Sequence, residues 1–521
     1  MPDGRAYGYR MLIRAGRLFS DAARQFADRV ALGDGTSYRE LDAAVSRVGS
    51  GLAALGINAG ERVGVLSHNR PELIALWLGL ERAGLVRVVL HSHFDVGVHA
   101  DMIERTAATA LVFDTRFTSA LRGVAGKLAG IRVFVGMGGG CPEWAVPYGE
   151  LLARGDAGFE PPDLDEDAPV CIQPTTGTTD MPKPWTVSHR AWATLVVHNL
   201  IHLGGLAPFG DDEVNLHVHA LPWASGAQTL LPYMLHGAQT IVLDDAGFDP
   251  SLVATAIQDS QATGVLLPGP MLGPVLDAID SRPGFTHRLR RVVTLFATPE
   301  LLERTTRVLG PVWCHGYGST EQGAPVTRLI AREAGSRPAS VGRKASPLIE
   351  LAVMDSGGRQ LPAGHVGEIV VRSPMSGGRY WDDPALSERA FSRGHWFRSG
   401  DLGFLDEDGF LTYVDRSHDA ISTPSGYVYP HEVEAAVLRH PAVASCGAVG
   451  LGDGTAQEVV AAVLLKPGKT AKPGEIAAAA ADALPAHAQP RIVIVSELPV
   501  VLGGAKVQRD VLRHQLTENA T

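Results

Sequence analysis

The chain has 521 residues and a formal net charge of −10, from 46 Lys and Arg against 56 Asp and Glu. This length predicts two or three domains, and a hydrophobic content of 45% is enough to build large cores, which excludes global disorder. The acidic balance argues against a nucleic-acid partner, because binding a phosphate backbone requires clustered Lys and Arg.

Apolar residues recur with alternating helical and strand periodicity through the first 300 residues. The pattern predicts helices at 38–60, 71–83 and about 97–107, and strands at 62–67, 86–90, about 109–113 and 168–172. Similar alternation runs through 185–245 and 252–300. Strands that alternate with helices imply βαβ units and a parallel sheet, so we expect an α/β fold.

The pattern changes in the last third of the chain. Short strands and turns over 345–415 predict a β-rich, more antiparallel piece. After Asp415 the alternation restarts on a smaller scale, with helices expected at 430–439 and 473–483, strands at 443–450, 458–466 and 491–496, and a helical tail from 506. We therefore expect a large N-terminal α/β domain over 1–415 and a small α+β domain at the C-terminus.

The four cysteines, Cys141, Cys171, Cys314 and Cys446, are far apart and form no CxxC pair. A disulfide framework or structural zinc site is thus disfavoured, and a cytoplasmic location is expected. The N-terminus has no apolar segment typical of a signal peptide, and no run of about 18 apolar residues predicts a membrane span. The 19 histidines form no compact ligand motif, so we expect most of them at the surface or in the core.

A hydroxyl-rich segment, QPTTGTTDMPKP, follows the strand predicted at 168–172. Its backbone N–H groups and hydroxyls suit polyphosphate oxygens, and its lysine supplies a positive charge. It lacks the GxxxxGK[ST] pattern of a P-loop, and a plain polar turn is the alternative. The candidate phosphate ligands are Thr175, Thr176, Gly177, Thr178, Thr179 and Lys183.

Three further segments follow in order: YGSTE at 317–321, FRSGDLGF at 397–404 with Arg416 beyond it, and LPVVLGGAKVQR at 498–509. Together with the hydroxyl-rich segment, they resemble the motifs of the adenylate-forming superfamily in order and spacing. That superfamily comprises acyl- and aryl-CoA synthetases, nonribosomal adenylation domains and luciferase. The resemblance covers about residues 15–515 and is closest to the acyl- and aryl-CoA ligases.

The resemblance implies binding of ATP or AMP with Mg²⁺, and formation of an acyl-adenylate and pyrophosphate. Tyr317, between Gly316 and Gly318, would stack on adenine. The Asp401 carboxylate would accept hydrogen bonds from the ribose hydroxyls, and Arg416 would assist there. The expected catalytic residues are Lys506, which would bridge the carboxylate and the α-phosphate, Thr320, which would contact that phosphate, and Glu321, which with Thr176 would hold Mg²⁺.

The resemblance also implies that the C-terminal domain is mobile. Its hinge would span 416–418 with His418 as the pivot, and the domain carrying Lys506 would span 419–521. His418 is itself a departure, since relatives carry Asp or Lys there. Other departures fall where relatives contact CoA or phosphate: Asp180, Pro184, Pro424, Asp453–Gln457 and His487–Pro490. The adenylation half is thus intact and the CoA half is eroded, although CoA stays the default acceptor.

Comparison with the family's acid-binding elements places Trp223, Phe296, Ala297 and His315 around the acid. Phe296 stands where relatives carry glycine, and its volume favours a small or flat, aromatic acid. Three functions remain open: a CoA ligase; an adenylate-forming enzyme with another acceptor, such as an amine, a carrier thiol or an arylamine diazotised through activated nitrite; and a nucleotide-binding pseudoenzyme. We expect small-molecule partners, and either a monomer or a homodimer.

Overall fold

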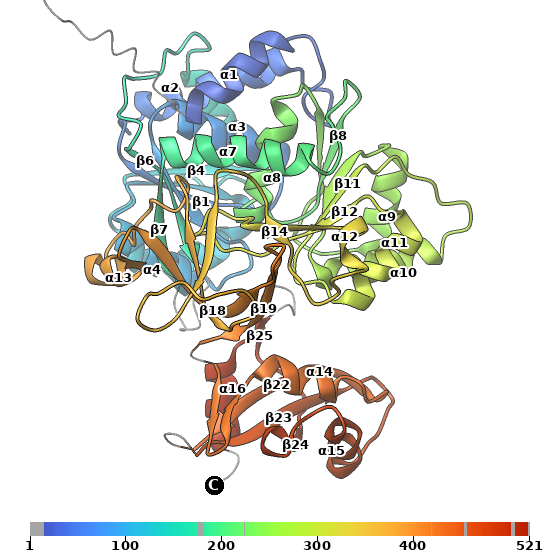
Figure 1. The fold of residues 1–521 in the computed structure, drawn as a ribbon. Coiled ribbons are helices and arrows are strands. Elements are labelled where there is room, and N and C mark those ends of the chain that lie inside the picture. The colour runs from blue at the N-terminus through green and yellow to red at the C-terminus, as the bar shows by residue number, and fades with distance from the viewer. Residues whose placement is uncertain are drawn as a thin grey trace, which may run out of the picture.

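The computed structural model describes residues 15–175, 182–222, 224–417, 419–452, 456–501 and 506–518, with only the backbone at residues 225, 227, 427, 501 and 506. Two seven-stranded sheets form the large N-terminal part (Figure 1). The first has the order β5-β4-β3-β1-β2-β6-β7 and is parallel except for the last pair. Its strands are β1 Arg62–Leu66, β2 Val86–Leu90, β3 Ala110–Asp114, β4 Val133–Met137, β5 Val146–Pro147, β6 Pro169–Thr175 and β7 Lys183–Ser188.

The second sheet has the order β14-β13-β12-β11-β10-β8-β9. Strands β8 to β12 pair with one another in parallel, whereas β13 pairs antiparallel with both β12 and β14. Its strands are β8 Val214–His217, β9 Gln239–Val242, β10 Gly264–Leu266, β11 Arg291–Thr294, β12 Trp313–His315, β13 Thr327–Ile330 and β14 Arg343–Lys344. The parallel α/β fold predicted from the alternating pattern is confirmed.

Thirteen helices accompany these sheets among the described residues up to 417. They are α1 Ala15–Gln25, α2 Tyr38–Ala54, α3 Pro71–Arg82, α4 Val96–Thr106, α5 Thr118–Gly123, α6 Tyr148–Arg154, α7 His189–Gly204, α8 Ala224–Met234, α9 Pro250–Asp259, α10 Gly269–Asp280, α11 Pro299–Leu309, α12 Ala331–Ala334 and α13 Pro384–Arg389. Helix α2 begins at a capping box formed by Ser37 and Glu40.

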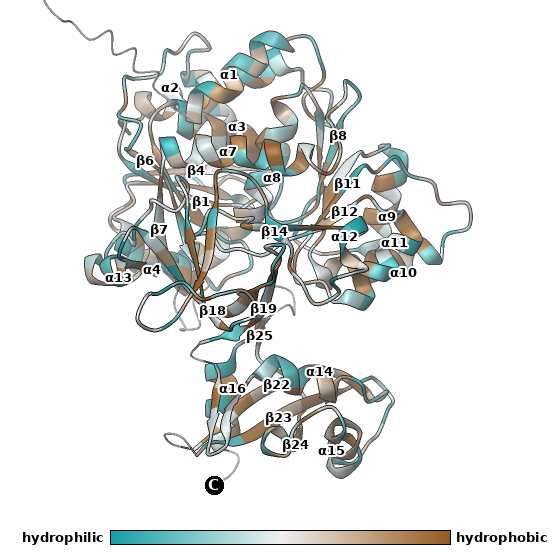
Figure 2. Ribbon diagram, viewed as in Figure 1, coloured by the Kyte–Doolittle hydropathy of each residue, from teal (hydrophilic) through white to brown (hydrophobic). Residues whose placement is uncertain are grey.

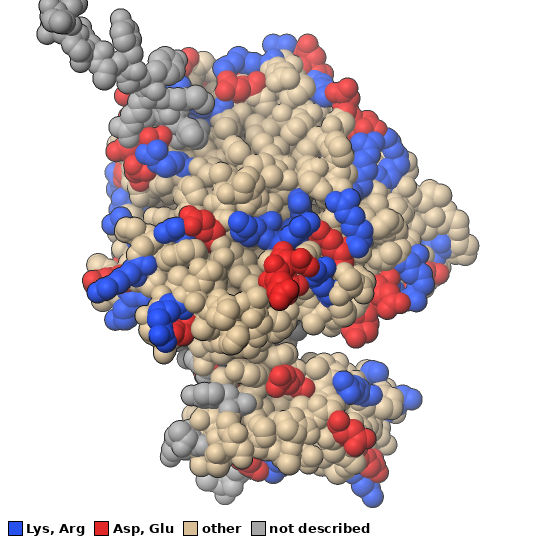
Figure 3. All heavy atoms as spheres, viewed as in Figure 1, with Lys and Arg blue, Asp and Glu red and all other residues tan. Residues whose placement is uncertain are grey.

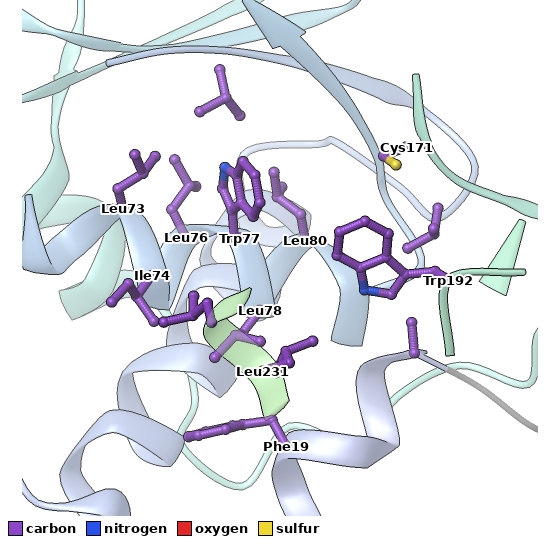
Figure 4. Close-up of a cluster of buried hydrophobic side chains, with 14 of the residues drawn as sticks. Phe19, Leu73, Ile74, Leu76, Trp77, Leu78, Leu80, Cys171, Trp192 and Leu231 are labelled. Carbon is purple, nitrogen blue, oxygen red and sulfur yellow. The ribbon is translucent and has the colours of Figure 1, made fainter. Parts of the chain in front are cut away.

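Helix α3 lies at the centre of the largest core. Every residue from Leu73 to Arg82 is buried, which is the pattern of a helix enclosed on all sides. Figure 4 shows its side chains packed against Phe19 of α1, Trp192 of α7 and Leu231 of α8. Figure 2 shows the same distribution of polarity: hydrophobic residues, in brown, lie along the strands, and hydrophilic residues, in teal, lie on outer turns.

The β-rich region predicted at 345–415 is an antiparallel sheet, as expected. Its order is β15-β16-β18-β17, and β19 also pairs with β18. The strands are β15 Glu350–Met354, β16 Gly367–Arg372, β17 Phe391–Ser392, β18 Trp396–Leu405 and β19 Leu411–Arg416.

The C-terminal part is a small separate body, joined to the rest through a constriction that is also visible in the space-filling view (Figures 1 and 3). Its sheet pairs β22 with β23 antiparallel and β23 with β24 parallel, over its own buried cluster. The elements are β20 Ile421–Thr423, β21 Gly426–Val428, α14 Pro430–Val437, β22 Val443–Leu451, β23 Glu458–Leu465, α15 Pro473–Ala481, β24 Arg491–Ile494, β25 Val500–Val501, β26 Lys506–Val507 and α16 Arg509–Glu518. All four cysteines are free, and no described helix is long and apolar enough to cross a membrane.

Candidate active site

The hydroxyl-rich segment joins two neighbouring antiparallel strands. Thr175 is the last residue of β6 and lies directly opposite Lys183, the first residue of β7. Thr175 is buried and Lys183 is half-buried. The structure therefore positions both ends of the predicted phosphate loop, whereas Thr176, Gly177, Thr178 and Thr179 lie outside the described residues.

Tyr317, Asp401 and Arg416 come together although they are distant in sequence. The Tyr317 hydroxyl donates to Asp401 Oδ2 at 2.5 Å, and Arg416 Nε lies 3.1 Å from Asp401 Oδ1. Asp401 in β18 and Arg416 in β19 are direct cross-strand partners, so the sheet register fixes this ion pair. Burial, and then the Asp401 carboxylate, holds the pKa of Tyr317 well above its ordinary value. The tyrosine therefore stays protonated and donates to the carboxylate.

The turn that carries Tyr317 follows β12 and depends on small residues. Gly318 has φ +155°, and a Cβ there would lie 2.8 Å from the Cβ of Ala324. A Cβ on Gly316 would lie 2.7 Å from the carbonyl oxygen of Thr327. Both positions therefore exclude larger residues. The two glycines thus let this turn pack closely against the segment from Ala324 to Thr327.

Glu321 and Thr320 occupy the same turn and are partly exposed. Tyr380 Oη donates to Glu321 Oε1 at 3.4 Å, and its ring packs edge-on against Trp185 at 5.0 Å. Because Trp185 is two residues beyond Lys183 on β7, these aromatic residues connect the Glu321 turn to the phosphate hairpin. The sequence reasoning missed Tyr380, which belongs to no motif.

Three of the residues predicted around the acid, Phe296, Ala297 and His315, lie at the carboxyl ends of β11 and β12. The Ala297 backbone N–H donates to His315 Nε2 at 3.4 Å, so these two residues are adjacent. Burial lowers the pKa of His315 to about 4, so its imidazole is neutral near pH 7. Phe296, in contrast, is 57% exposed, with φ +56°. Its predicted role in limiting the size of the acid stays a prediction.

Three predicted residues cannot be placed by their side chains. Trp223 and His418 lie outside the described residues. Lys506 is described through its backbone alone, in β26, where it pairs with Val501 of β25. The roles predicted for these three residues therefore stay predictions.

His198 is a supporting residue that the sequence did not single out. It is fully buried on α7, and its Nε2–H donates to the Pro325 carbonyl at 2.8 Å, while its Nδ1 accepts from the Ser346 hydroxyl at 2.7 Å. Since a carbonyl can only accept, this pairing fixes the neutral tautomer. His198 thereby holds the segment just after Glu321 against α7.

A second group of charges surrounds the predicted hinge. Arg509 of α16 donates to both oxygens of Glu434 at 2.8 and 3.0 Å, and lies 3.5 Å from Asp419. Asp415, at the end of β19, accepts the backbone N–H of His431 at 3.0 Å. The chain on either side of residue 418 is thus fixed by buried polar contacts.

The sequence model of the "AMP-binding enzyme" family matches residues 19–381, which is more than half of the chain. The chain belongs to the AMP-binding enzyme family. The model of the "AMP-binding enzyme C-terminal domain" matches residues 432–501. The protein is therefore an AMP-forming ligase of the adenylate-forming superfamily, similar to acyl- and aryl-CoA ligases, as the motifs predicted.

Two curated relatives show this similarity over most of the chain. A medium/long-chain fatty-acid–CoA ligase from Mycobacterium tuberculosis is 29% identical and covers 90% of this chain and 83% of its own length. An indoleacetate–CoA ligase from Aromatoleum aromaticum is also 29% identical and covers 92% of both chains.

Solved structures show the same fold. An anthranilate CoA ligase in complex with anthranoyl-AMP aligns over 97% of this chain and 98% of its own, with a TM-score of 0.86 at 23% identity. The amide bond synthetase McbA from Marinactinospora thermotolerans aligns over 95% and 99%, with a TM-score of 0.81 at 26% identity.

Proposed function

We propose that this enzyme activates a small, aromatic carboxylic acid with ATP and transfers the acyl group from its adenylate to CoA. The arrangement of Tyr317, Asp401 and Arg416 carries this proposal. It offers an aromatic ring and a charge-paired carboxylate side by side, which suits a base and the hydroxyls of a ribose. Family membership supports the same assignment.

In the first step, a carboxylate oxygen of the acid attacks the α-phosphorus, and the bond to pyrophosphate breaks. Lys183 and the hydroxyl-rich loop would hold the phosphates, and Thr320 would contact the α-phosphate. The Lys506 ammonium would lie between the two anions and offset the charge that develops there. The Glu321 carboxylate suits Mg²⁺, because this hard cation prefers carboxylate oxygens. The bound ion would neutralise phosphate charge.

In the second step, the CoA thiol attacks the acyl carbonyl and AMP leaves. We propose that residues 416–418 form the hinge for this step, between a domain over 1–415 and a mobile domain over 419–521. The two separate family matches, 19–381 and 432–501, support this division.

The choice of an aromatic acid rests on the uncharged His315 and on the acids for which the relatives are named. His315 is buried and uncharged, and it lies beside Ala297, a surrounding that suits an apolar or flat group. Relatives named for indoleacetate, ferulate and 2-succinylbenzoate act on aromatic acids. An aromatic acid is therefore the first choice.

An amine is the second candidate acceptor. The fold of an amide bond synthetase matches nearly the whole chain, and Pro424 and His487 depart from the residues that CoA-using relatives carry. Loss of aromatic and basic groups there removes stacking and phosphate pairing for the CoA nucleotide.

Pyrophosphate release with ATP and Mg²⁺ tests the proposal. We would compare small aromatic acids, aliphatic acids and nitrite, each alone, with CoA and with an arylamine. Release that needs an aromatic acid, with a thioester product when CoA is added, supports the CoA ligase. Amide or diazonium products without a response to CoA would assign another acceptor, and ATP binding without any release would indicate a pseudoenzyme.

The Lys506→Ala substitution tests the catalytic assignment. We expect acid-dependent ATP–pyrophosphate exchange to fall by about 100-fold or more, because one charge that stabilises the transition state is lost. ATP binding measured by calorimetry should change little. Lys469→Ala, an exposed lysine of the same domain, is the matched control. Undiminished exchange by Lys506→Ala would refute the assignment.

A further inference from the structure

A histidine–aspartate cluster consists of His68, His93, Asp244 and Asp245, none of which belongs to the motifs of the proposed nucleotide site. His68 follows β1 and His93 follows β2, both in the first sheet. Asp244 and Asp245 follow β9, the edge strand of the second sheet. These side chains come from the carboxyl ends of parallel strands, so the fold brings three separate loops to one place.

The ligand atoms of the cluster are close together. His68 Nδ1 lies 3.4 Å from Asp245 Oδ1, and His93 Nε2 lies 3.1 Å from Asp245 Oδ2. One ligand atom each of His68, Asp244 and Asp245 lies within 4.8 Å of the others. Two ligands bound about 2.1 Å from a tetrahedral zinc ion lie about 3.4 Å apart. The His68–Asp245 separation therefore matches an edge of such a site.

The surroundings orient the two carboxylates. The Asn69 backbone N–H donates to Asp245 Oδ1 at 2.6 Å, and the Ser92 hydroxyl donates to Asp245 Oδ2 at 3.2 Å. Arg116 donates to Asp244 Oδ2 at 2.7 Å. Metal sites need outer partners of this kind, because these partners fix the direction of the ligand lone pairs.

The charge of the cluster also suits a divalent cation. The two aspartates supply negative charge, and the His68 imidazole adds a nitrogen ligand. The nearby Arg116 is itself paired with Asp114 at 2.7 Å, so its charge is offset within the fold. Imidazole together with carboxylate favours zinc, cobalt or nickel over magnesium or calcium.

The cluster is exposed to solvent on its Asp244 side. The side chain of Asp245 is 7% exposed and that of His68 is 14% exposed, whereas Asp244 is 54% exposed. A cavity of about 560 Å³ lies beside them, lined by Asn69, Arg70, Glu72, Asp114, Arg116 and Asp244. Of the proposed ligands, Asp244 is the one that faces this cavity.

We propose that His68, Asp244 and Asp245 bind one divalent ion of the zinc class between the two sheets, with His93 as an outer partner that orients the Asp245 carboxylate. The ion joins the loop after β1 to the loop after β9. It is distinct from the Mg²⁺ that accompanies ATP, because none of its ligands belongs to the nucleotide-binding turn or hairpin. Its effect is to stabilise the contact between the sheets.

The test uses the full chain, stripped with EDTA and kept free of ATP and Mg²⁺. Titration with ZnCl₂ by calorimetry should show one saturable site, and Co²⁺ should give the visible absorption of a nitrogen–oxygen site. Zn²⁺ should also raise the unfolding temperature. In Asp244→Asn and His68→Gln the affinity should fall by more than about 100-fold, because even residues outside a ligand set contribute about 10–100-fold.

His365→Ala removes an exposed histidine far along the chain and should keep full Zn²⁺ affinity. Asp244 is exposed, so Asp244→Asn should fold even if His68→Gln does not, and melting in EDTA checks this. Absence of a saturable site in the wild-type chain would overturn the proposal. Equal Zn²⁺ affinity in Asp244→Asn, His365→Ala and wild type would also overturn it, since the ion would then bind elsewhere.

Discussion

At the scale of single residues, Asp401 links the two halves of the proposed nucleotide site. Its buried carboxylate accepts a hydrogen bond from the Tyr317 hydroxyl and forms an ion pair with Arg416. In Asp401→Asn we expect the KM for ATP to rise by about 10–100-fold, because a hydrogen bond to a charged group contributes about 1.5–3 kcal/mol. Steady-state kinetics with varied ATP measures the effect.

Asp408→Asn serves as the control for this prediction. Asp408 follows the same strand β18, but its side chain is 68% exposed and pairs with Arg337 at the surface. Its KM for ATP should stay within about twofold of wild type, since exposed ion pairs contribute about 1 kcal/mol or less. If both substitutions raised the KM for ATP equally, Asp401 would not belong to the ATP site.

Buried neutral histidines predict how stability depends on pH. Burial lowers the pKa of His198 and of His315 to about 4, below the ordinary 6.5. Between pH 6.5 and 4 the unfolded chain therefore binds more protons than the folded chain. Stability should fall as the pH falls through this window, on the order of 2 kcal/mol for each such group at pH 5.

Urea unfolding of the N-terminal part at pH 7 and pH 5 checks this expectation. In His198→Gln the difference between the two pH values should shrink, because one titrating group is removed. In His365→Gln, an exposed position, it should stay as in wild type. A His198→Gln chain with an unchanged pH dependence would show that His198 does not contribute to the acid destabilisation.

At the scale of elements, Arg509 fixes α16 and, through it, the adjoining strand β26 with Lys506. Its guanidinium is 14% exposed and contacts Glu434 and Asp419. In Arg509→Met both carboxylates lose a buried partner, so the C-terminal part should be destabilised by about 3–5 kcal/mol. Differential scanning calorimetry measures this, and acid-dependent pyrophosphate exchange should fall as well.

Arg491→Met is the matched control for Arg509→Met. Arg491 pairs with Glu458, but both side chains are about half exposed, at 46% and 53%. The expected loss is about 1 kcal/mol or less. If both substitutions lowered the transition equally, the Arg509 contacts would have no special role in holding α16.

Element limits show where sequence reasoning was accurate and where it was not. Helix α3 and strands β1 and β2 lie within one residue of their predicted limits, because their apolar runs are continuous and end at Gly, Pro or polar residues. The helix predicted at 38–60 ends at Ala54 instead. Gly56 there adopts φ +83°, a left-handed conformation that terminates a helix.

At the scale of the whole molecule, the N-terminal and C-terminal parts have separate buried cores. We expect His418→Pro to preserve acid-dependent pyrophosphate exchange but to slow thioester formation, since proline fixes φ at the proposed pivot. Single-turnover assays separate the two steps. The control is Ser425→Pro, outside the proposed hinge. Equal losses in both half-reactions would contradict a hinge at this position.

The sequence by itself determined the alternation of elements, the family and most members of the proposed site, because periodicity and short motifs are local in the chain. It also indicated the β-rich region and the small C-terminal part.

The tertiary structure alone decided which residues meet. Tyr380 reaches Glu321, and His198 holds the segment after it. His68 and Asp245, 177 positions apart, also meet only because two parallel sheets end at a common edge. Such contacts depend on sheet order and strand register, which no local pattern encodes.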